Sequence, residues 1–348
     1  MSAADQLQGL TLDGGWQVIQ QMSQQPSSGG FHSVPYLVKD AQGKEHFLKA
    51  FDFSRAFEPG RDVIHELQLL TSVYENERDI LEHCKRRRLS RVVVAVTFGY
   101  VQVSTMPGPS GTVYYLIFEL AESDVRRQVD LKTRLDCLTC LKILDDVTLG
   151  MMQIHNEAIA HQDLKPSNVL IYGKDGSRVA DFGRASRRGN EIWIKDLKVA
   201  GDHSYAPPEQ LYSHLHPDFV TRRVGCDLYL LGNLAAFLFS GVNITSAIFA
   251  RLDPQFLPQN WAGTYDDVLP HIRRAFHDVI TDLSAAIDPL VRDDIIVLIK
   301  ELCNPELAKR GHRKGLGSGS QYSLERYKSQ TDLMLKRASA SIRARKSA

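Results

Sequence analysis

Cysteine is scarce in this sequence. Five cysteines occur in 348 residues, and an odd number in a long chain argues against the disulfide-rich scaffolds of small secreted proteins. Cys137 and Cys140 form a Cys-x-x-Cys pair, but no second Cys pair or His pair follows at zinc spacing. Because this stretch also has helical periodicity, we interpret both residues as core-facing cysteines of a helix rather than as a metal or redox site.

Long apolar segments are also missing. The longest apolar run, 228–239, is interrupted by Gly232 and Asn233 and is too short to span a bilayer. Residues 1–10 are polar and contain no apolar core of a signal peptide. We therefore expect a soluble, cytoplasmic protein without a membrane span.

Net charge is almost absent, since 42 Lys and Arg residues stand against 41 Asp and Glu residues, a net charge of +1. This balance argues against nucleic-acid binding over a large basic surface. The charge is uneven, however: residues 311–348 contain nine basic and two acidic residues, a net charge of +7, which leaves −6 for the first 310 residues. This basic tail has three interpretations: a solvated, partly disordered end, a segment that docks on a partner or on the rest of the fold, or a contact with nucleic acid or a membrane surface.

The composition itself is that of an ordinary globular protein, with 43% apolar and 24% charged residues. The first 120 residues are rich in strand patterns. A hairpin is predicted from 31–39 and 45–51, further strands over 91–98 and 112–118, and one helix over 62–84.

After residue 120 the pattern becomes helical. Apolar residues recur every three or four positions over 135–155, and helices dominate 227–307. A small hairpin is predicted at 169–172 and 178–180, and an amphipathic helix over 323–340.

The residues that could take part in catalysis lie on either side of this small hairpin in the sequence. The segment 161–168 reads His-Gln-Asp-Leu-Lys-Pro-Ser-Asn and lies between a predicted helix and a predicted strand. Asp163 could accept a proton from an attacking hydroxyl, Lys165 could neutralise a transferring phosphoryl group, and Asn168 offers an oxygen suited to Mg²⁺. Asp181, in the Asp-Phe-Gly of 181–183, is a second oxygen donor for a metal.

Together these residues resemble the catalytic loop and the metal-binding Asp-Phe-Gly of the eukaryotic-like protein kinase superfamily. The Leu-Lys-Pro-x-Asn order is closer to its Ser/Thr branch than to its Tyr branch. The resemblance implies a two-lobed α+β fold, with a β-rich N-lobe over 16–119, a helical C-lobe over 120–312 and the basic tail over 313–348. It also implies ATP and Mg²⁺ as cofactors, and transfer of the γ-phosphoryl group to Ser or Thr hydroxyls of protein substrates.

The resemblance assigns roles to single residues. Asp163 is the proton acceptor and Lys165 stabilises the γ-phosphoryl group, while Asn168 and Asp181 hold the metal. Lys49 stands where the family has its phosphate-binding strand lysine. Glu77 is the predicted helix partner of Lys49, with Glu66 as the alternative.

The nucleotide-binding positions match less well. Gly29, Gly30, Phe31 and Val34 can be placed on the family's glycine-rich loop, although Ser27 and His32 replace its outer glycines. Phe47 occupies the position two residues before Lys49 where an alanine usually lies against adenine, so a bulky ring narrows the expected site. Phe118 falls at the back of that site, and Glu119 to Ala121 resemble the hinge that binds adenine.

Three further matches concern folding and regulation. Glu209, in Tyr-Ala-Pro-Pro-Glu, and Arg310 resemble a structural ion pair, and Asp227 resembles the helix aspartate that holds the catalytic loop. Gln162 precedes Asp163, where many relatives carry an arginine that reads a phosphate on the activation loop. We therefore expect that phosphorylation between 183 and 207, where Ser186, Ser204 and Tyr205 lie, is not the main switch.

Two rival interpretations stay open at this point. A small-molecule kinase of related fold would share the Asp, Asn and Asp positions, but usually lacks the Lys-Pro and the Ala-Pro-Glu segments. A kinase-like scaffold without strong catalysis is suggested by Phe47 and by the loss of the outer glycines from the glycine-rich loop. The predicted partners are a protein substrate and a docking partner of the basic tail.

Overall fold

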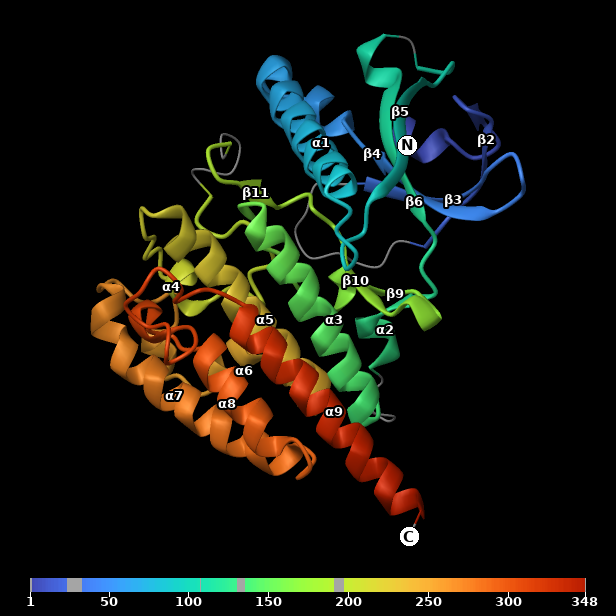
Figure 1. The fold of residues 1–348 in the computed structure, drawn as a ribbon. Helices are drawn as coiled ribbons and strands as arrows, with labels where there is room; N and C mark the ends of the chain where they lie inside the picture. Colours follow the sequence, from blue (N-terminus) through green and yellow to red (C-terminus); the bar gives the residue numbers. More distant parts are fainter. Residues whose placement is uncertain (1, 24–32, 107, 130–134, 191–196, 348) are drawn as a thin grey trace. The chain divides into compact units, whose positions relative to one another are not determined.

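The computed structural model describes residues 2–23, 33–106, 108–129, 135–190 and 197–347, with side chains up to residue 344. The chain forms two compact units (Figure 1). Unit 1 comprises Met1–Arg88 and Val93–Ala121, and unit 2 comprises Leu89–Val92 and Glu122–Ala348.

Unit 1 is built on an antiparallel sheet of six strands in the order β1-β2-β3-β4-β6-β5. The strands are β1 (Thr11–Leu12), β2 (Trp16–Gln21), β3 (Ser33–Lys39), β4 (Glu45–Phe51), β5 (Ala95–Gln102) and β6 (Thr112–Glu119). β3 and β4 form the predicted hairpin. Buried residues alternate along both strands, because one face of the sheet packs on an apolar core that contains Val34, Leu48 and Ile117.

The helix of unit 1, α1, extends over Val63–Arg86, close to the predicted 62–84. It begins at Asp62, whose carboxylate accepts hydrogen bonds from the backbone N–H groups of Ile64 and His65. Its buried residues recur at helical spacing, and they include Glu77 beside apolar neighbours such as Leu70 and Leu81. A charged residue on the buried face indicates a specific partner.

The strand predicted over 91–98 is wrong in its position. β5 begins only at Ala95 and continues to Gln102. Val92 instead makes a single parallel bridge with Val179 in unit 2, and both Val92 and Val93 are buried. Val92 and Val93 are therefore core residues outside β5, and only the end of the valine run belongs to the sheet.

Unit 2 is mainly helical. Its helices are α2 (Val125–Gln128), α3 (Cys137–Asn156), α4 (Pro208–Leu211), α5 (Gly225–Ser240), α6 (Ile244–Phe249), α7 (Tyr265–Ala286), α8 (Arg292–Leu302) and α9 (Glu325–Ser347). α5 contacts α3, α6, α7 and α8, and all of its residues except Phe237 are buried. The apolar run 228–239 is thus a core helix, and among the described residues no helix is long and apolar enough to cross a membrane.

Short strand pairs lie at both ends of the segment that carries the predicted chemistry. β9 (Val169–Ile171) and β10 (Ser177–Val179) form the small hairpin, and β7 (Ser123–Asp124) pairs with β9. β8 (Ile159–Ala160) pairs with β11 (Ser186–Arg187). Residues 161–168 therefore leave one strand pair and enter another, which fixes both ends of the loop.

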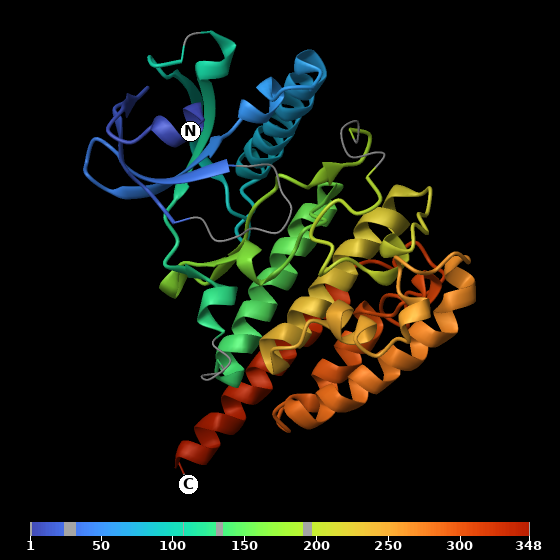
Figure 2. The ribbon, with the colours of Figure 1, turned by 180° about the vertical axis from the view of Figure 1, so that it is seen from behind.

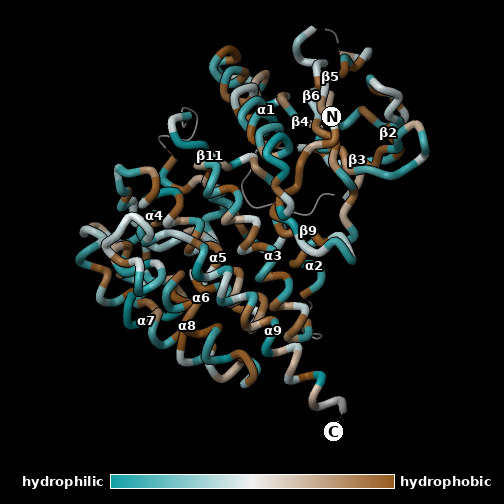
Figure 3. The backbone as a smooth tube through the Cα atoms, viewed as in Figure 1, coloured by the Kyte–Doolittle hydropathy of each residue, from teal (hydrophilic) through white to brown (hydrophobic). Residues whose placement is uncertain are grey.

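The basic tail is not a disordered end over its described part. α9 extends the predicted helix 323–340 by several residues and packs along α3 (Figures 1 and 2). The side chains of Lys328 and Thr331 both bind the carboxylate of Asp145 on α3, at 2.8 and 2.7 Å. Hydrophobic and hydrophilic stretches alternate along α9 (Figure 3), as expected for a helix with one buried face. The buried residues of this region are Leu324, Tyr327, Thr331, Met334 and Ala338.

The cysteines form no disulfide within the described residues. Cys140 is buried in α3 and Cys137 is half-buried, so Cys140 lies in a core as the sequence predicts. Burial raises the pKa of the Cys137 thiol to about 11 and that of Cys140 to about 12. At neutral pH both sulfurs are therefore protonated thiols.

Candidate active site

The loop 161–168 is held in place by hydrogen bonds to α5. Asp227, fully buried in α5, accepts hydrogen bonds from the backbone N–H groups of His161 at 2.8 Å and Gln162 at 2.7 Å. The ring of His155 at the end of α3 lies 2.8 Å from the same carboxylate. Asp227 therefore holds the loop backbone, as the sequence predicts.

The carboxylate of Asp163 is held by three contacts. Its carboxylate accepts a hydrogen bond from Asn168 Nδ2 at 3.1 Å, and one from the backbone N–H of Asp202 at 2.8 Å. The ammonium group of Lys165 lies 3.3 Å from Asp163 Oδ2. Burial raises the pKa of Asp163, while Lys165 opposes that rise by favouring the charged form. A buried carboxylate with a raised pKa and an adjacent cation can accept a proton from a hydroxyl.

The two predicted metal ligands lie at the same end of the β9–β10 hairpin. Asn168 precedes β9, Asp181 follows β10, and the carbonyl of Asn168 accepts a hydrogen bond from Ala180 N at 2.9 Å. Asp181 is exposed and has a φ of 63°, in the left-handed region that non-glycine residues seldom adopt. The negative charge of Asp181 also contributes to the raised pKa of Asp163.

This donor set fits magnesium. Mg²⁺ is usually bound by one or two carboxylates, substrate phosphates and water rather than by a cage of protein ligands. One amide oxygen and one exposed carboxylate provide such a partial set. Within the described residues, no cluster of three or more His, Cys, Asp or Glu side chains could hold a metal alone.

Asp202 and Gly201 belong to this site, although the sequence analysis did not single them out. Besides its backbone bond to Asp163, Asp202 places a carboxylate oxygen 3.4 Å from Lys165 Nζ. A Cβ atom at Gly201 would lie 2.3 Å from the carbonyl oxygen of Gln162 and 2.6 Å from Asp163 Oδ1. Only glycine permits this close approach. In the sequence, both residues could have been found only as a Gly-Asp pair shortly before the Tyr-Ala-Pro-Pro-Glu segment.

Arg184 is a third residue of this site that no sequence motif indicates. Burial lowers the pKa of its guanidinium, and the charges of Asp163 and Asp181 partly offset that effect. A guanidinium stays charged at neutral pH even so. Arg184 therefore brings a positive charge to the neighbourhood of both carboxylates.

Lys49 and Glu77 form the predicted ion pair in unit 1. Lys49 Nζ lies 2.8 and 2.9 Å from the two carboxylate oxygens of Glu77. The alternative, Glu66, is wrong as the partner, because it pairs with Arg61 at 2.9 Å and Arg55 at 3.8 Å. The pairing is confirmed, while the catalytic role of Lys49 stays a prediction.

Phe47 shares a face of the sheet with Lys49, because residues two apart on a strand point to the same side. It lies opposite Phe118 in the β4–β6 register, with 6.3 Å between the ring centroids. Phe47 is half-buried and Phe118 is buried. Two phenylalanine rings thus lie next to each other on the face that carries the lysine, where a purine was expected.

Val34 is a correction. In the β3–β4 register it pairs with Ala50, and both residues lie in the apolar core of unit 1. This is the opposite face from Lys49, whose register partner is Pro35. The prediction that Val34 lines the nucleotide site is therefore wrong, because a shift of one residue exchanges the two faces of a strand.

The other predicted nucleotide positions are placed as follows. Gly29, Gly30 and Phe31 lie outside the described residues. Glu119 ends β6 opposite His46, and Ala121 follows it at the end of unit 1. Both are partly exposed, and their role as an adenine-binding hinge stays a prediction.

Glu209 and Arg310 form the predicted buried pair in unit 2. The guanidinium makes two parallel contacts with the carboxylate, at 2.7 and 2.8 Å. Arg310 also donates to the carbonyl oxygens of Asn304 at 2.9 Å and Gly225 at 3.1 Å. Burial alone would lower the pKa of Arg310, but the charge of Glu209 raises it above its usual value.

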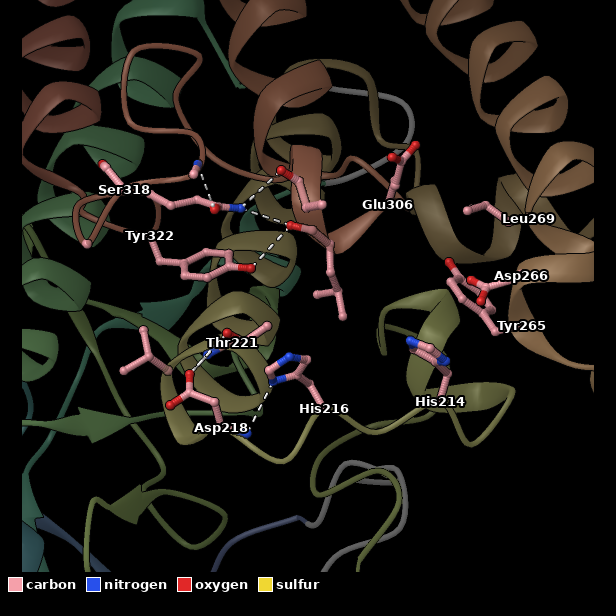
Figure 4. A pocket seen from close by; sticks show the side chains of 16 residues that line it. His214, His216, Asp218, Thr221, Tyr265, Asp266, Leu269, Glu306, Ser318 and Tyr322 are labelled. Carbon is pink, nitrogen blue, oxygen red and sulfur yellow. Dashed lines mark hydrogen bonds between the residues drawn. The ribbon is translucent and has the colours of Figure 1, made fainter.

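A separate pocket of about 680 Å³ lies in unit 2, lined by the segment after α4, the start of α7 and the loop before α9 (Figure 4). Its acidic Glu306 is already paired with Lys309 at 2.9 Å and Arg273 at 3.9 Å. Gln321 and Tyr322 donate to backbone carbonyls. None of the predicted catalytic or metal residues lines this pocket, so we assign it no part in the candidate chemistry.

Comparison with known proteins agrees with this geometry. Residues 27–313 match the family model of the protein kinase domain. The chain belongs to the protein kinase family. The sheet-based unit 1 and the helical unit 2 are accordingly the N-lobe and C-lobe of the two-lobed α+β kinase fold, which confirms the predicted fold class. α9 lies beyond the matched residues.

The similar proteins are kinases of several kinds. A mitosis inhibitor protein kinase, wee1, of Schizosaccharomyces pombe is 38% identical over 86 residues, which cover 24% of this chain and 9% of that protein. Mitogen-activated protein kinase 7 of Arabidopsis thaliana is 26% identical over 42% of this chain and 40% of its own length. An Aurora kinase of Debaryomyces hansenii is 27% identical over 41% of this chain and 36% of its own length. The chain thus spans less than half the length of these relatives.

Proposed function

We propose that this kinase domain transfers the γ-phosphoryl group of ATP to Ser or Thr hydroxyls of protein substrates. The observation that supports the proposal most strongly is the environment of Asp163, which is buried and contacted by Lys165, Asn168 and the backbone of Asp202. A carboxylate fixed by three donors keeps one orientation, as a proton acceptor in phosphoryl transfer needs.

Four residues of the candidate site have defined parts in the proposed reaction. Asp163 accepts the proton of the substrate hydroxyl, whose oxygen forms a bond to the γ-phosphorus as the bond to ADP breaks. Lys165 stabilises the negative charge on the transferring group. Lys49, oriented by Glu77, binds the α- and β-phosphates.

Magnesium would be held by Asn168 and Asp181, and when bound it neutralises charge on the phosphates. The Lys at position 165 and the Pro after it favour Ser and Thr as acceptors, through their resemblance to the Ser/Thr branch. Docking of a partner on the basic residues of α9 and a location in the cytoplasm remain predictions from the sequence.

The proposal is tested by incubating the full chain with labelled ATP, Mg²⁺ and generic protein substrates, followed by analysis of the phosphorylated amino acids. We expect phosphoserine and phosphothreonine, and loss of both with Asp163→Asn. Asp175→Asn is the matched control, because Asp175 is exposed on the far turn of the β9–β10 hairpin and loses the same charge. Equal labelling with Asp163→Asn and wild type would refute the proposed role, and phosphotyrosine alone would refute the acceptor class.

A kinase-like scaffold is the second candidate, and a specific observation favours it. Phe47 places an aromatic ring on the face of Lys49, next to Phe118, where adenine was expected. If the ring excludes nucleotide, the wild-type chain shows neither ATP binding nor turnover, whereas Phe47→Ala binds ATP. Measurable turnover by the wild type would reject the scaffold.

A further inference from the structure

Gln162, the residue before Asp163, joins three segments of unit 2. Its backbone has a φ of 65°, in the left-handed region that is strained for a residue with a side chain. Its N–H donates to Asp227 Oδ1 at 2.7 Å. Such a conformation persists only where the surroundings hold it, so the contacts of the Gln162 side chain are informative.

Both ends of the Gln162 amide are bonded. Oε1 accepts a hydrogen bond from Arg223 Nη1 at 2.7 Å. Nε2 donates to the carbonyl oxygen of Arg184 at 3.0 Å and to Ser186 Oγ at 2.9 Å. Gln162 is 3% exposed, Arg223 1% and Ser186 0%, so water does not compete for these bonds.

Arg223 determines which way the amide points. A guanidinium has donors and no acceptor, so only the carbonyl end of Gln162 can face it. The amide NH₂ group is therefore directed at Arg184 O, which can only accept, and at the Ser186 hydroxyl. In the reverse orientation, donors would face the guanidinium and an oxygen would face a carbonyl, and both contacts would be repulsive.

Arg223 and Asp227 act on the same residue from one helical face. Arg223 lies in the π-helical turn η6 (Val220–Val224), which leads directly into α5, and Asp227 lies four residues further on. Residues four apart on a helix are neighbours on its surface. Asp227 holds the backbone of Gln162 and Arg223 holds its side chain, and π-helical turns within helices often mark such functional positions.

We propose that Arg223 is a positioning residue for Asp163, acting through Gln162. The same contact holds the start of the activation segment, which spans residues 183–207, in place without a phosphate group. The inference rests on the proposed function for its catalytic part. Residues 184–187 are tied to the catalytic loop by the Gln162 amide and by the β8–β11 pairing. The Ser186 hydroxyl is already bonded inside the fold, so it is a structural group and not an acceptor for a regulatory phosphate.

Exchanging the two side chains gives the sharpest test. Gln162→Arg alone brings two guanidinium groups together in a buried site, and we expect kcat to fall by about 10²-fold with the KM for ATP little changed. Combining Gln162→Arg with Arg223→Gln leaves one guanidinium and one amide carbonyl, and should recover most of that loss. A double variant no more active than Gln162→Arg would overturn the proposal, because two independent structural defects would not compensate each other.

A second measurement does not depend on turnover. Arg223→Gln should accelerate amide hydrogen exchange in both 159–163 and 184–187, whereas Arg222→Gln is the control in the same turn, since Arg222 donates to Leu197 O instead. Gln162→Glu should keep its contact with Arg223 as an ion pair, and hence the fold, but lose the donor to Arg184 O. We expect it to accelerate exchange in 184–187 alone, and wild-type exchange there would overturn the tether.

The two measurements also separate this inference from the proposed function. If the wild-type chain transfers no phosphoryl group, yet Arg223→Gln loosens both segments, the proposed function fails and the positioning contact stands. If turnover is normal and neither Arg223→Gln nor Gln162→Glu changes exchange, the inference fails alone.

Discussion

Removal of the carboxylate from the Glu209–Arg310 pair should destabilise unit 2 strongly. Arg310 is fully buried and Glu209 is 3% exposed, so Glu209→Leu leaves a guanidinium in a site that water does not reach. Loss of one partner of a buried ion pair costs about 3–5 kcal/mol. For a unit of this size, each kcal/mol lowers Tm by about 2–4 °C, so we expect a decrease of roughly 6–20 °C.

The assay is thermal and urea unfolding of the full chain. Lys309→Gln is the matched control, because it removes the neighbouring contact with Glu306, in which the lysine side chain is 53% exposed. An exposed pair contributes about 0–1 kcal/mol, so this variant should unfold close to the wild type. If Glu209→Leu were no more destabilising than Lys309→Gln, the assignment of Glu209 as the counter-charge would be refuted.

The double variant Glu209→Leu with Arg310→Met separates charge from hydrogen bonding. Apolar replacement of a whole buried pair is often nearly neutral. Here the carbonyls of Asn304 and Gly225 also lose their donor, at a cost of about 1–3 kcal/mol each. The double variant should therefore recover only part of the stability lost by Glu209→Leu.

Three further predictions follow from other parts of the chain. Burial raises the pKa of Asp163 above 3.8, and a proton acceptor must be ionised, so kcat should fall on acidification at a pH above the pKa of an exposed aspartate. A pH profile of kcat without this acidic decrease would contradict the role of Asp163 as proton acceptor. Tyr327→Ala, at a fully buried position of α9, should cost about 3–5 kcal/mol in unfolding experiments, and Tyr327→Phe, which loses the bond to the Glu301 carboxylate, about 1.5–3 kcal/mol. A loss below about 1 kcal/mol for Tyr327→Ala would contradict the packing of α9 on the rest of unit 2. Phe47→Ala should lower the KM for ATP in steady-state titrations, and a higher value would indicate that the ring supports the nucleotide.

The catalytic loop could be predicted because its residues follow one another along the chain. Asp163, Lys165 and Asn168 lie within six positions, and the hairpin that brings Asp181 beside them is itself local. Spacing therefore carried most of the information. The Lys49–Glu77 pair is 28 positions apart, and only the resemblance to the kinase family pointed to Glu77 rather than Glu66 as the partner of Lys49.

The errors came from positions where one residue or one distant contact decides. Val34 was assigned to the wrong face because the outer glycines of the loop are absent, which left the strand register undetermined by one residue. Arg223 carries no motif, and its contact with Gln162 spans 61 positions. The helix in the tail follows from its amphipathic pattern, but its charge leaves three interpretations open, and the buried residues between its basic positions decide that it packs on α3.

The thiols described above make this kinase domain suitable for site-directed labelling. Four of the five cysteines are buried, and burial raises the pKa of the half-buried Cys137 to about 11. Maleimides and iodoacetamides react with thiolates, so the native protein should be modified slowly. A single cysteine introduced by His203→Cys, on an exposed position beside Asp202, would accept a fluorophore selectively and report on the activation segment without first removing any natural thiol.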